Sequence, residues 1–164
     1  MGVSATGKTT IAKGMCHELG YEFIEGDSLH PQANIAKMEA GIPLTDEDRE
    51  PWLRAIAARV AEKEADGVST VVTCSALRRT YRDLLRSAPT HDPFFVHLAA
   101  SYDVLEKRMA HRTKHFMPTS LLRSQFDTLE PLAADEDGVE VDVTPPVPEV
   151  VEAAVIAVRK RFPD

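Results

Sequence analysis

The stretch that decides the fold stands near the start of the chain and reads Gly2-Val3-Ser4-Ala5-Thr6-Gly7-Lys8-Thr9. It matches the pattern G-x-x-x-x-G-K-S/T at every fixed position. A glycine at each end lets the backbone turn its N–H groups toward a phosphate, and a helix starting near Lys8 adds the positive end of its dipole. The Lys8 ammonium reaches the outer phosphates of a nucleotide, and the Thr9 hydroxyl can ligate Mg²⁺. The stretch therefore predicts a nucleotide-binding loop, with ATP and Mg²⁺ as cofactors.

Helix and strand signals alternate along the rest of the chain. Runs typical of buried strands lie at 21–24, 69–74, 94–98 and 139–143, and helical patterns lie at 8–19, 31–40, 51–65, 76–87, 101–112, 121–129 and 147–158. Thr45 and Asp48 have the spacing of a capping box, and Pro51 can open the longest helix. Apolar strands between helices are typical of a parallel sheet covered on both faces. We predict an α/β fold of three layers, in one domain over residues 1–164.

The composition argues against a nucleic-acid-binding protein and against a membrane protein. Acidic residues outnumber basic ones 26 to 19, a formal charge of −7, which disfavours a surface that neutralises nucleic-acid phosphates. No apolar run approaches the ~20 residues that span a bilayer, and the first residues lack a signal-peptide pattern. The two cysteines, Cys16 and Cys74, have no metal-ligand spacing. We expect a cytoplasmic protein with no nucleic-acid partner and no membrane partner.

A strand is expected before the phosphate-binding loop, yet only Met1 precedes Gly2. In folds built on this loop, that strand has about five residues and lies in the middle of the sheet. Its removal would open a gap of about 9.6 Å, twice the ~4.8 Å strand spacing, lined with unpaired backbone groups. We therefore expect the first central strand to be missing from this sequence and the native chain to begin upstream of Met1.

Asp27 follows the run at 21–24 and falls on the edge where α/β sheets bind ligands. A carboxylate there can accept the proton of a substrate hydroxyl or hold a Mg²⁺-bound water. The alternative is a turn or cap residue. The run at 69–74 ends in Cys74-Ser75, where loops of this kind often have an aspartate for Mg²⁺. Asp27 is therefore the expected carboxylate for the metal, together with Thr9.

Several strings resemble those of bacterial gluconokinases, which belong to the shikimate kinase-like P-loop kinases. They are GDSLHP at 26–31, Asn34, Lys37-Met38, GIPL at 41–44, Asp46, Asp48-Arg49, PWL at 51–53, CSAL at 74–77, YRDLLR at 81–86, HFM at 115–117, LL at 121–122, SQF at 124–126 and Leu129-Glu130. The resemblance extends from Met1 to about Val143. It implies ATP-dependent phosphorylation of D-gluconate to 6-phospho-D-gluconate, a five-stranded sheet of order 2-3-1-4-5, a lid and a homodimer.

A small sugar acid needs a cation for its carboxylate and hydrogen-bonding groups for its hydroxyls. The candidates for the carboxylate are Arg49, Arg78 and Arg82, and we favour Arg82 because its helix would line the pocket. His30 and Lys37 are candidates for the hydroxyls. For each of these residues, a solvated or ion-paired surface charge is the alternative.

Arg108 and Arg112 are four residues apart, so they share a helix face just before the expected lid at 112–120. Arginines that close over the γ-phosphate can accelerate phosphoryl transfer by ~10³-fold or more. An exposed basic pair is the alternative. His115 could join them at the substrate. Thr144, in the turn 142–146, could flank the adenine or belong to an ordinary strand-to-helix turn.

Two other functions stay open. One is a kinase for another small acid or polyol, such as shikimate. The other is a nucleotide-binding module without catalysis, crippled by the missing strand.

Overall fold

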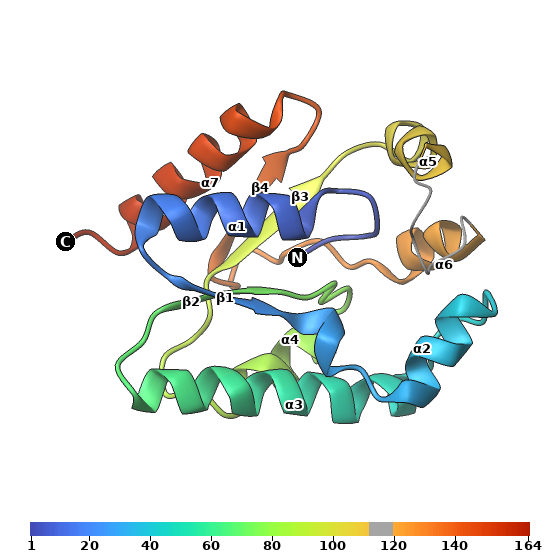
Figure 1. The fold of residues 1–164 in the computed structure, drawn as a ribbon, viewed down its shortest axis with the longest axis horizontal. Coiled ribbons are helices and arrows are strands. Elements are labelled where there is room, and N and C mark those ends of the chain that lie inside the picture. The colour runs from blue at the N-terminus through green and yellow to red at the C-terminus, as the bar shows by residue number, and fades with distance from the viewer. Residues whose placement is uncertain (112–119) are drawn as a thin grey trace.

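The computed structural model describes residues 1–111 and 120–164. Helices and strands alternate as the sequence predicts (Figure 1). Their bounds are α1 Lys8–Leu19, β1 Glu22–Glu25, the 3-10 helix η1 Gly26–Leu29, α2 Gln32–Glu39, α3 Asp46–Ala65, β2 Thr70–Thr73, α4 Arg79–Arg86, β3 Phe95–Ala99, α5 Tyr102–Ala110, α6 Ser120–Thr128, β4 Gly138–Asp142 and α7 Val147–Arg161. The proposed lid at 112–120 falls almost wholly outside the described residues. No described helix is both long and apolar enough to cross a membrane.

The ends of two helices show how the local sequence sets their bounds. Gly7 and Gly20 flank α1 with φ of 83° and 71°, values that favour glycine. At α3 the Thr45 hydroxyl accepts from the backbone N–H of Asp48, whose carboxylate accepts from Thr45 N–H. This capping box confirms the prediction. Pro51 does not open α3, because the helix already begins at Asp46.

The strands form two parallel pairs. β1 pairs with β2, with Glu22 opposite Thr70, and β3 pairs with β4, with Phe95 opposite Gly138. The order β1-β2 and then β3-β4 matches 2-3-1-4-5 with the central position left without a strand in the described part of the chain. Within the described residues, β2 and β3 do not pair with each other, so the two pairs are separate sheets.

The core lies on both faces of the strands. One apolar cluster includes Leu53 and Ile56 of α3, and the other includes Ile11 of α1 and Ala154 of α7. Figure 1 shows α1 and α7 on one side of the strands and α3 and α4 on the other. This is the three-layer arrangement that the apolar strands predict.

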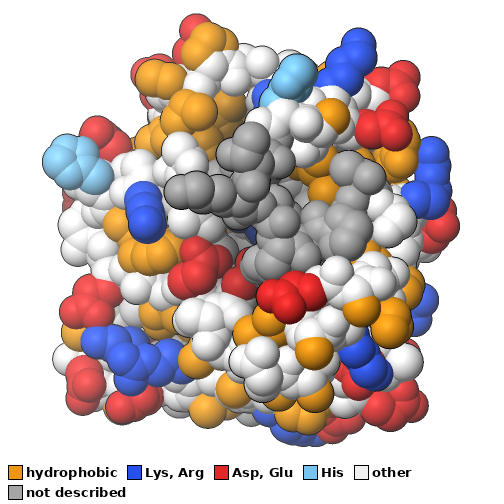
Figure 2. Space-filling model, turned by 45° about the vertical axis from the view of Figure 1, so that its right-hand side comes forward, with side chains coloured by type: hydrophobic (Ala, Val, Ile, Leu, Met, Phe, Trp, Pro, Cys, Tyr) orange, Lys and Arg blue, Asp and Glu red, His pale blue; other side chains and the backbone are white. Residues whose placement is uncertain are grey.

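The surface carries charges of both signs. Figure 2 shows Lys and Arg side chains interspersed with Asp and Glu over the described residues of one face. Several of them form exposed ion pairs, such as Arg54 with Glu50 at 2.9 Å and Arg59 with Glu62 at 2.7 Å. Pairs of this kind contribute little to stability because water screens them.

Candidate active site

The phosphate-binding loop is held in a curled conformation between β3 and α1. A Cβ on Gly2 would lie 2.6 Å from the carbonyl oxygen of Leu98, so only glycine lets the loop approach β3 this closely. Ala5 and Gly7 both have positive φ, 69° and 83°. The Lys8 ammonium donates to the carbonyls of Gly2 and Val3 at 3.1 and 3.0 Å. A cation therefore sits over the loop at the start of a helix, which fits a polyphosphate.

Glu25, the last residue of β1, connects the loop to the neighbouring strand. The Thr9 hydroxyl donates to Glu25 Oε2 at 2.7 Å, and the Thr73 hydroxyl donates to Glu25 Oε1 at 2.6 Å. Sequence reasoning missed Glu25. Its position at the carboxyl end of a strand, next to the predicted Asp27, was the available signal.

Asp27 follows directly in η1, and packing sets its place. A Cβ on Gly26 would lie 1.9 Å from the carbonyl oxygen of Thr73, so the chain can pass here only as glycine. The Trp52 indole N–H donates to the Gly26 carbonyl oxygen at 2.8 Å. The Asp27 side chain, half exposed, lines a cavity of about 50 Å³ together with Lys8. The structure thus brings the predicted acceptor carboxylate and the predicted phosphate-binding lysine to one cavity.

The rest of the cavity wall comes from the phosphate-binding loop, the stretch 30–52, the stretch 75–77 after β2, and α6. It is made of Ser4, His30, Met38, Pro43, Leu44, Arg49, Trp52, Ser75, Leu77, Leu121, Ser124 and Gln125. Most of these residues lie in the strings that resemble gluconokinases.

His30 is buried in this wall and stacks on Trp52, with ring centroids 3.8 Å apart. Its Nδ1 lies 3.2 Å from Asn34 Nδ2, and its Nε2 lies 4.0 Å from Asp27 Oδ1. Burial, and then the positive charge of Arg49, lower the pKa of His30 to about 4. His30 is therefore a neutral imidazole at neutral pH, suited to hydrogen bonding with a hydroxyl.

Of the residues predicted to bind the acceptor through a cation, Arg49 is the one that lines this cavity. It is buried, and its Nη1 donates to the Tyr81 hydroxyl at 2.8 Å. Arg78 lies outside the cavity wall, 3.7 Å from Asp46. Lys37 also lies outside it, 2.7 Å from the Asp48 carboxylate.

The structure corrects the expectation for Arg82. Its side chain is 0% exposed and forms a two-bond ion pair with Glu136, with N–O distances of 2.6 and 2.8 Å. It also donates to the carbonyls of Ala76 and Glu130 at 2.8 and 3.1 Å. With its guanidinium occupied inside the protein, Arg82 is a structural cation that joins α4 to the segment after α6.

Arg108 and Thr144 meet beside the start of α7. Arg108 Nη2 donates to the Val143 carbonyl oxygen at 2.6 Å, and Thr144 donates to Asp142 through both its backbone N–H and its hydroxyl, at 2.9 and 2.7 Å. The two predicted nucleotide contacts are thus neighbours. Arg112 and His115 lie outside the described residues.

Gln125 of α6 is a second residue that sequence reasoning missed. Its side-chain oxygen accepts from the backbone N–H of Ser4 at 2.7 Å. The bond links the phosphate-binding loop to the helix that follows the undescribed segment. The string SQF was visible in the sequence, but nothing in it indicates a partner that is 121 residues away.

Comparison with known proteins identifies the family of this chain. A family model described as an AAA domain matches residues 1–132. The thermoresistant gluconokinase of Escherichia coli is 43% identical over 162 residues, which cover 98% of this chain and 91% of that protein. The chain belongs to the gluconokinase family.

Solved structures agree with this family. A gluconokinase from Sinorhizobium meliloti 1021 is 48% identical, with a TM-score of 0.88 and coverage of 98% of this chain and 90% of that one. A sugar kinase from Janibacter sp. HTCC2649 is 51% identical, with a TM-score of 0.92 and coverage of 96% and 91%. The fold of this gluconokinase family member is therefore the P-loop kinase fold, which binds ATP.

Proposed function

We propose that this protein catalyses the ATP-dependent phosphorylation of D-gluconate to 6-phospho-D-gluconate. The observation that carries the proposal is the shared cavity, which joins Lys8 of the phosphate-binding loop to Asp27 and to the buried Arg49. Two gluconokinase relatives, 43% and 49% identical over most of their length, support the choice of acceptor. A kinase for another small acid or polyol, such as shikimate, has no comparable support.

In the proposed reaction, the role of each side chain follows from its charge and hydrogen-bonding groups. ATP supplies the phosphoryl group, whose bond to the β-phosphate breaks as a bond to the 6-hydroxyl oxygen of gluconate forms. Asp27 orients that hydroxyl and accepts its proton, while Lys8 stabilises the negative charge of the phosphates. His30 donates or accepts a hydrogen bond with a second hydroxyl. Arg49, with its guanidinium at the wall, binds the gluconate carboxylate.

Mg²⁺ is part of this proposal, and the donor set fits it. Thr9, Glu25 and Asp27 supply hydroxyl and carboxylate oxygens around the loop, the ligand type that Mg²⁺ prefers. No three His, Cys, Asp or Glu side chains within residues 1–111 and 120–164 gather to hold a metal by themselves. A magnesium ion would therefore rely on the nucleotide phosphates and water as well, which is usual for this ion. We also propose a cytoplasmic homodimer.

The test is ADP release with D-gluconate, with shikimate and without acceptor, each with and without Mg²⁺. With Mg²⁺ present, we expect turnover with gluconate to exceed turnover with shikimate and turnover without acceptor by at least ~10²-fold. The reason is that only a bound acceptor holds its hydroxyl in position to attack the γ-phosphate. Equal ADP release in the presence and absence of gluconate would contradict the proposal. Turnover with shikimate alone would assign a different acceptor to the same fold.

A further inference from the structure

Arg49 of α3 is the buried cation in the wall of the cavity beside Asp27, and a phenol holds its side chain. Its Nη1 donates to the Tyr81 hydroxyl at 2.8 Å, and the centre of its guanidinium lies 5.2 Å from the centroid of the Tyr81 ring. Burying an arginine is costly unless its charge and its N–H donors find partners. Tyr81 supplies a hydrogen-bond acceptor but no full charge, so an anion that enters the cavity would complete the surroundings of Arg49.

Asp46, the first residue of α3, sets the direction of the Tyr81 hydroxyl. The hydroxyl donates to Oδ1 of Asp46. Burial, and then this hydrogen bond, raise the pKa of Tyr81, so its side chain is a neutral phenol at neutral pH. A phenol has one hydrogen to donate, and here that hydrogen points to Asp46. The Tyr81 oxygen therefore faces Arg49 as an acceptor, and it holds the guanidinium with one N–H directed at the phenol.

The Tyr81 hydroxyl also separates the Asp46 carboxylate from Arg49. It bonds to both residues, and the second oxygen of Asp46 lies 3.7 Å from Arg78 instead. A direct two-bond ion pair with Asp46 would occupy the edge of the guanidinium that a substrate carboxylate needs. Tyr81 thus fixes the guanidinium without neutralising its charge.

Packing keeps the Tyr81 ring in this place. The side chain is 3% exposed, and it belongs to the same apolar cluster as Trp52 and Leu53 of α3. Tyr81 lies on α4, which packs against α3, so its hydrogen bond to Arg49 joins two helices in contact. The hydroxyl is therefore presented to Arg49 from a fixed position.

We propose that Tyr81 is a positioning residue for acceptor selection: held by Asp46, its hydroxyl fixes the Arg49 guanidinium in the orientation that binds the carboxylate of an acidic acceptor. This inference rests on the proposed function, in which Arg49 binds the gluconate carboxylate. It adds a source of selectivity, because an acceptor with the same hydroxyls and no negative charge gains little from the fixed guanidinium.

The test measures kcat and KM for D-gluconate and for its amide, D-gluconamide, which has the same hydroxyls and no charge. Tyr81→Phe keeps the ring and removes the hydroxyl. We expect KM for gluconate to rise by about 5- to 20-fold and kcat to stay within about threefold, because a restraint on a charged partner is lost. The kinetic constants for gluconamide should stay within about twofold of those of the parent chain. A general loss of structure would instead impair both acceptors.

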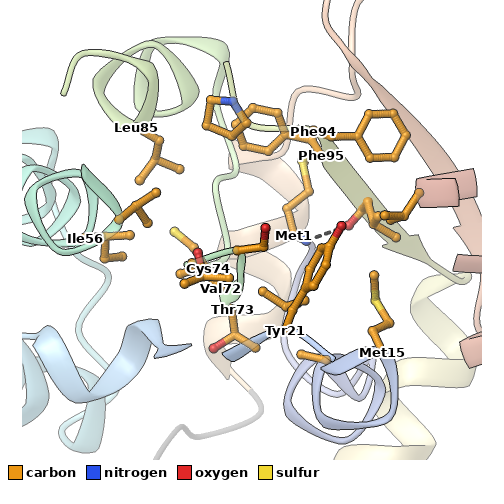
Figure 3. Close-up of a pocket in the computed structure, with 18 of the residues that line it drawn as sticks. Met1, Met15, Tyr21, Ile56, Val72, Thr73, Cys74, Leu85, Phe94 and Phe95 are labelled. Atoms are coloured by element: carbon orange, nitrogen blue, oxygen red, sulfur yellow. Dashed lines mark hydrogen bonds between the residues drawn. The ribbon is translucent and has the colours of Figure 1, made fainter. Parts of the chain in front are cut away.

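Tyr21→Phe is the matched control. Tyr21 lines a separate cavity of about 490 Å³ rather than the cavity beside Asp27 (Figure 3). This variant should match the parent chain with both acceptors.

A double variant separates positioning from packing. If Tyr81 acts through Arg49, Tyr81→Phe should change KM for gluconate by less than about twofold in the Arg49→Met background. The full single-variant effect in that background, or equal losses with gluconate and gluconamide, would overturn the proposal.

A second readout does not require turnover. In isotope-labelled protein observed by NMR, the Nη–H signals of Arg49 are identified by their absence from Arg49→Met. Their exchange with water should be at least ~10-fold slower in the parent chain than in Tyr81→Phe, because opening then requires loss of the hydrogen bond. Equal exchange in the two chains would overturn the positioning role. A parent chain with slow exchange but no turnover of gluconate would contradict the proposed function and still support the positioning of Arg49 by Tyr81.

Discussion

The Thr9 hydroxyl donates a 2.7 Å hydrogen bond to Glu25 Oε2, which ties the phosphate-binding loop to the end of β1. Glu25 is in turn held by Thr73 at 2.6 Å. The chain has Cys74-Ser75 at the strand end where an aspartate for Mg²⁺ is expected, and Glu25 supplies a carboxylate close to the loop from a different strand.

Replacing this carboxylate by an amide should impair the use of Mg²⁺. Glu25→Gln keeps the size of the side chain but removes its charge, so we expect a ~10- to 100-fold loss in activity or in metal affinity. The measurement is ADP release against Mg²⁺ concentration. Glu22→Gln, an exposed position on the same strand, is the control and should match the parent chain. An unchanged Mg²⁺ requirement in Glu25→Gln would assign Glu25 to structure alone.

Asp27 should matter for turnover far more than for nucleotide binding. Asp27→Asn removes the proton acceptor, and we expect kcat to fall by ~10²- to 10⁴-fold. ATP affinity, measured by calorimetry without Mg²⁺, should stay within about threefold, because Lys8 and the loop amides, rather than Asp27, hold the phosphates in the proposed mechanism. Asp66→Asn, at the exposed end of α3, serves as the matched control. Full activity in Asp27→Asn would remove Asp27 from its proposed role.

Arg82 should contribute mainly to the stability of the fold, and Arg49 mainly to the binding of gluconate. Arg82→Met removes the buried partner of Glu136 and leaves it only Arg86, at 2.8 Å, so the free energy of unfolding should fall by about 3 kcal/mol, the low end for a broken buried pair. Arg79→Met, on the same helix with an exposed ion pair to Asp135, should cost less than about 1 kcal/mol. Chemical denaturation measures both.

Variants of Arg49 and Arg82 should also differ in their KM for gluconate. Arg49→Met should raise KM for gluconate by at least ~10-fold, because it removes a charge-assisted bond to the carboxylate. Arg82→Met, assayed where it is still folded, should leave that KM within about twofold of the parent value. A large rise in KM for the Arg82 variant alone would place Arg82 in the acceptor site instead.

Ala5 has φ of 69° in the phosphate-binding loop, a region that L-residues occupy at a cost. Ala5→Gly relieves this strain and gives up some backbone entropy, so we expect a net gain of about 1 kcal/mol in stability. The temperature of unfolding should rise by about 2–4 °C. Ala58→Gly, at an exposed helical position of α3, should instead lower stability by about 1 kcal/mol. If Ala5→Gly and Ala58→Gly lower stability by the same amount, Ala5 is not strained.

Stability should depend on pH through His30. Because the pKa of His30 is about 4 in the folded protein, below the ordinary histidine value of 6.5, the unfolded chain binds more protons between these pH values. The stabilisation is complete above pH 6.5 and is lost as pH falls toward 4, by about 3 kcal/mol in total.

Denaturation midpoints across this pH range measure the effect. His30→Gln should make the slope of unfolding free energy against pH shallower, although His97, whose pKa burial also lowers to about 4, retains its own share. His17→Gln, at an exposed position, should leave the slope unchanged. An identical slope in the His30 variant would mean that His30 has the same pKa in both states.

Local patterns predicted most elements of the fold. The helix from Lys8 to Leu19 agrees with the structure at both ends, because Gly7 and Gly20 terminate it through their own backbone preferences. The capping box at Thr45 likewise depends on neighbours three residues apart. The prediction that Pro51 opens this helix is wrong, because the capping box at Thr45 already starts the helix at Asp46.

Contacts across long stretches of sequence could not be predicted in the same way. Arg82 was expected in the acceptor site because it follows a strand by about two helical turns. Its actual partner, Glu136, is 54 residues away, and no local pattern reveals which face of α4 is buried against that segment. Gln125 and Glu25 were missed for the same reason.

The sequence by itself determined the alternation of helices and strands, the phosphate-binding loop and the carboxylate at position 27, because each rests on spacing or on the conformational preference of nearby residues. Only the tertiary structure decided which arginine lines the cavity beside Asp27, which carboxylate holds Thr9 and which carboxylate pairs with Arg82. Those outcomes depend on burial, where a charged or polar group must find a partner, and the partner is set by packing rather than by distance along the chain.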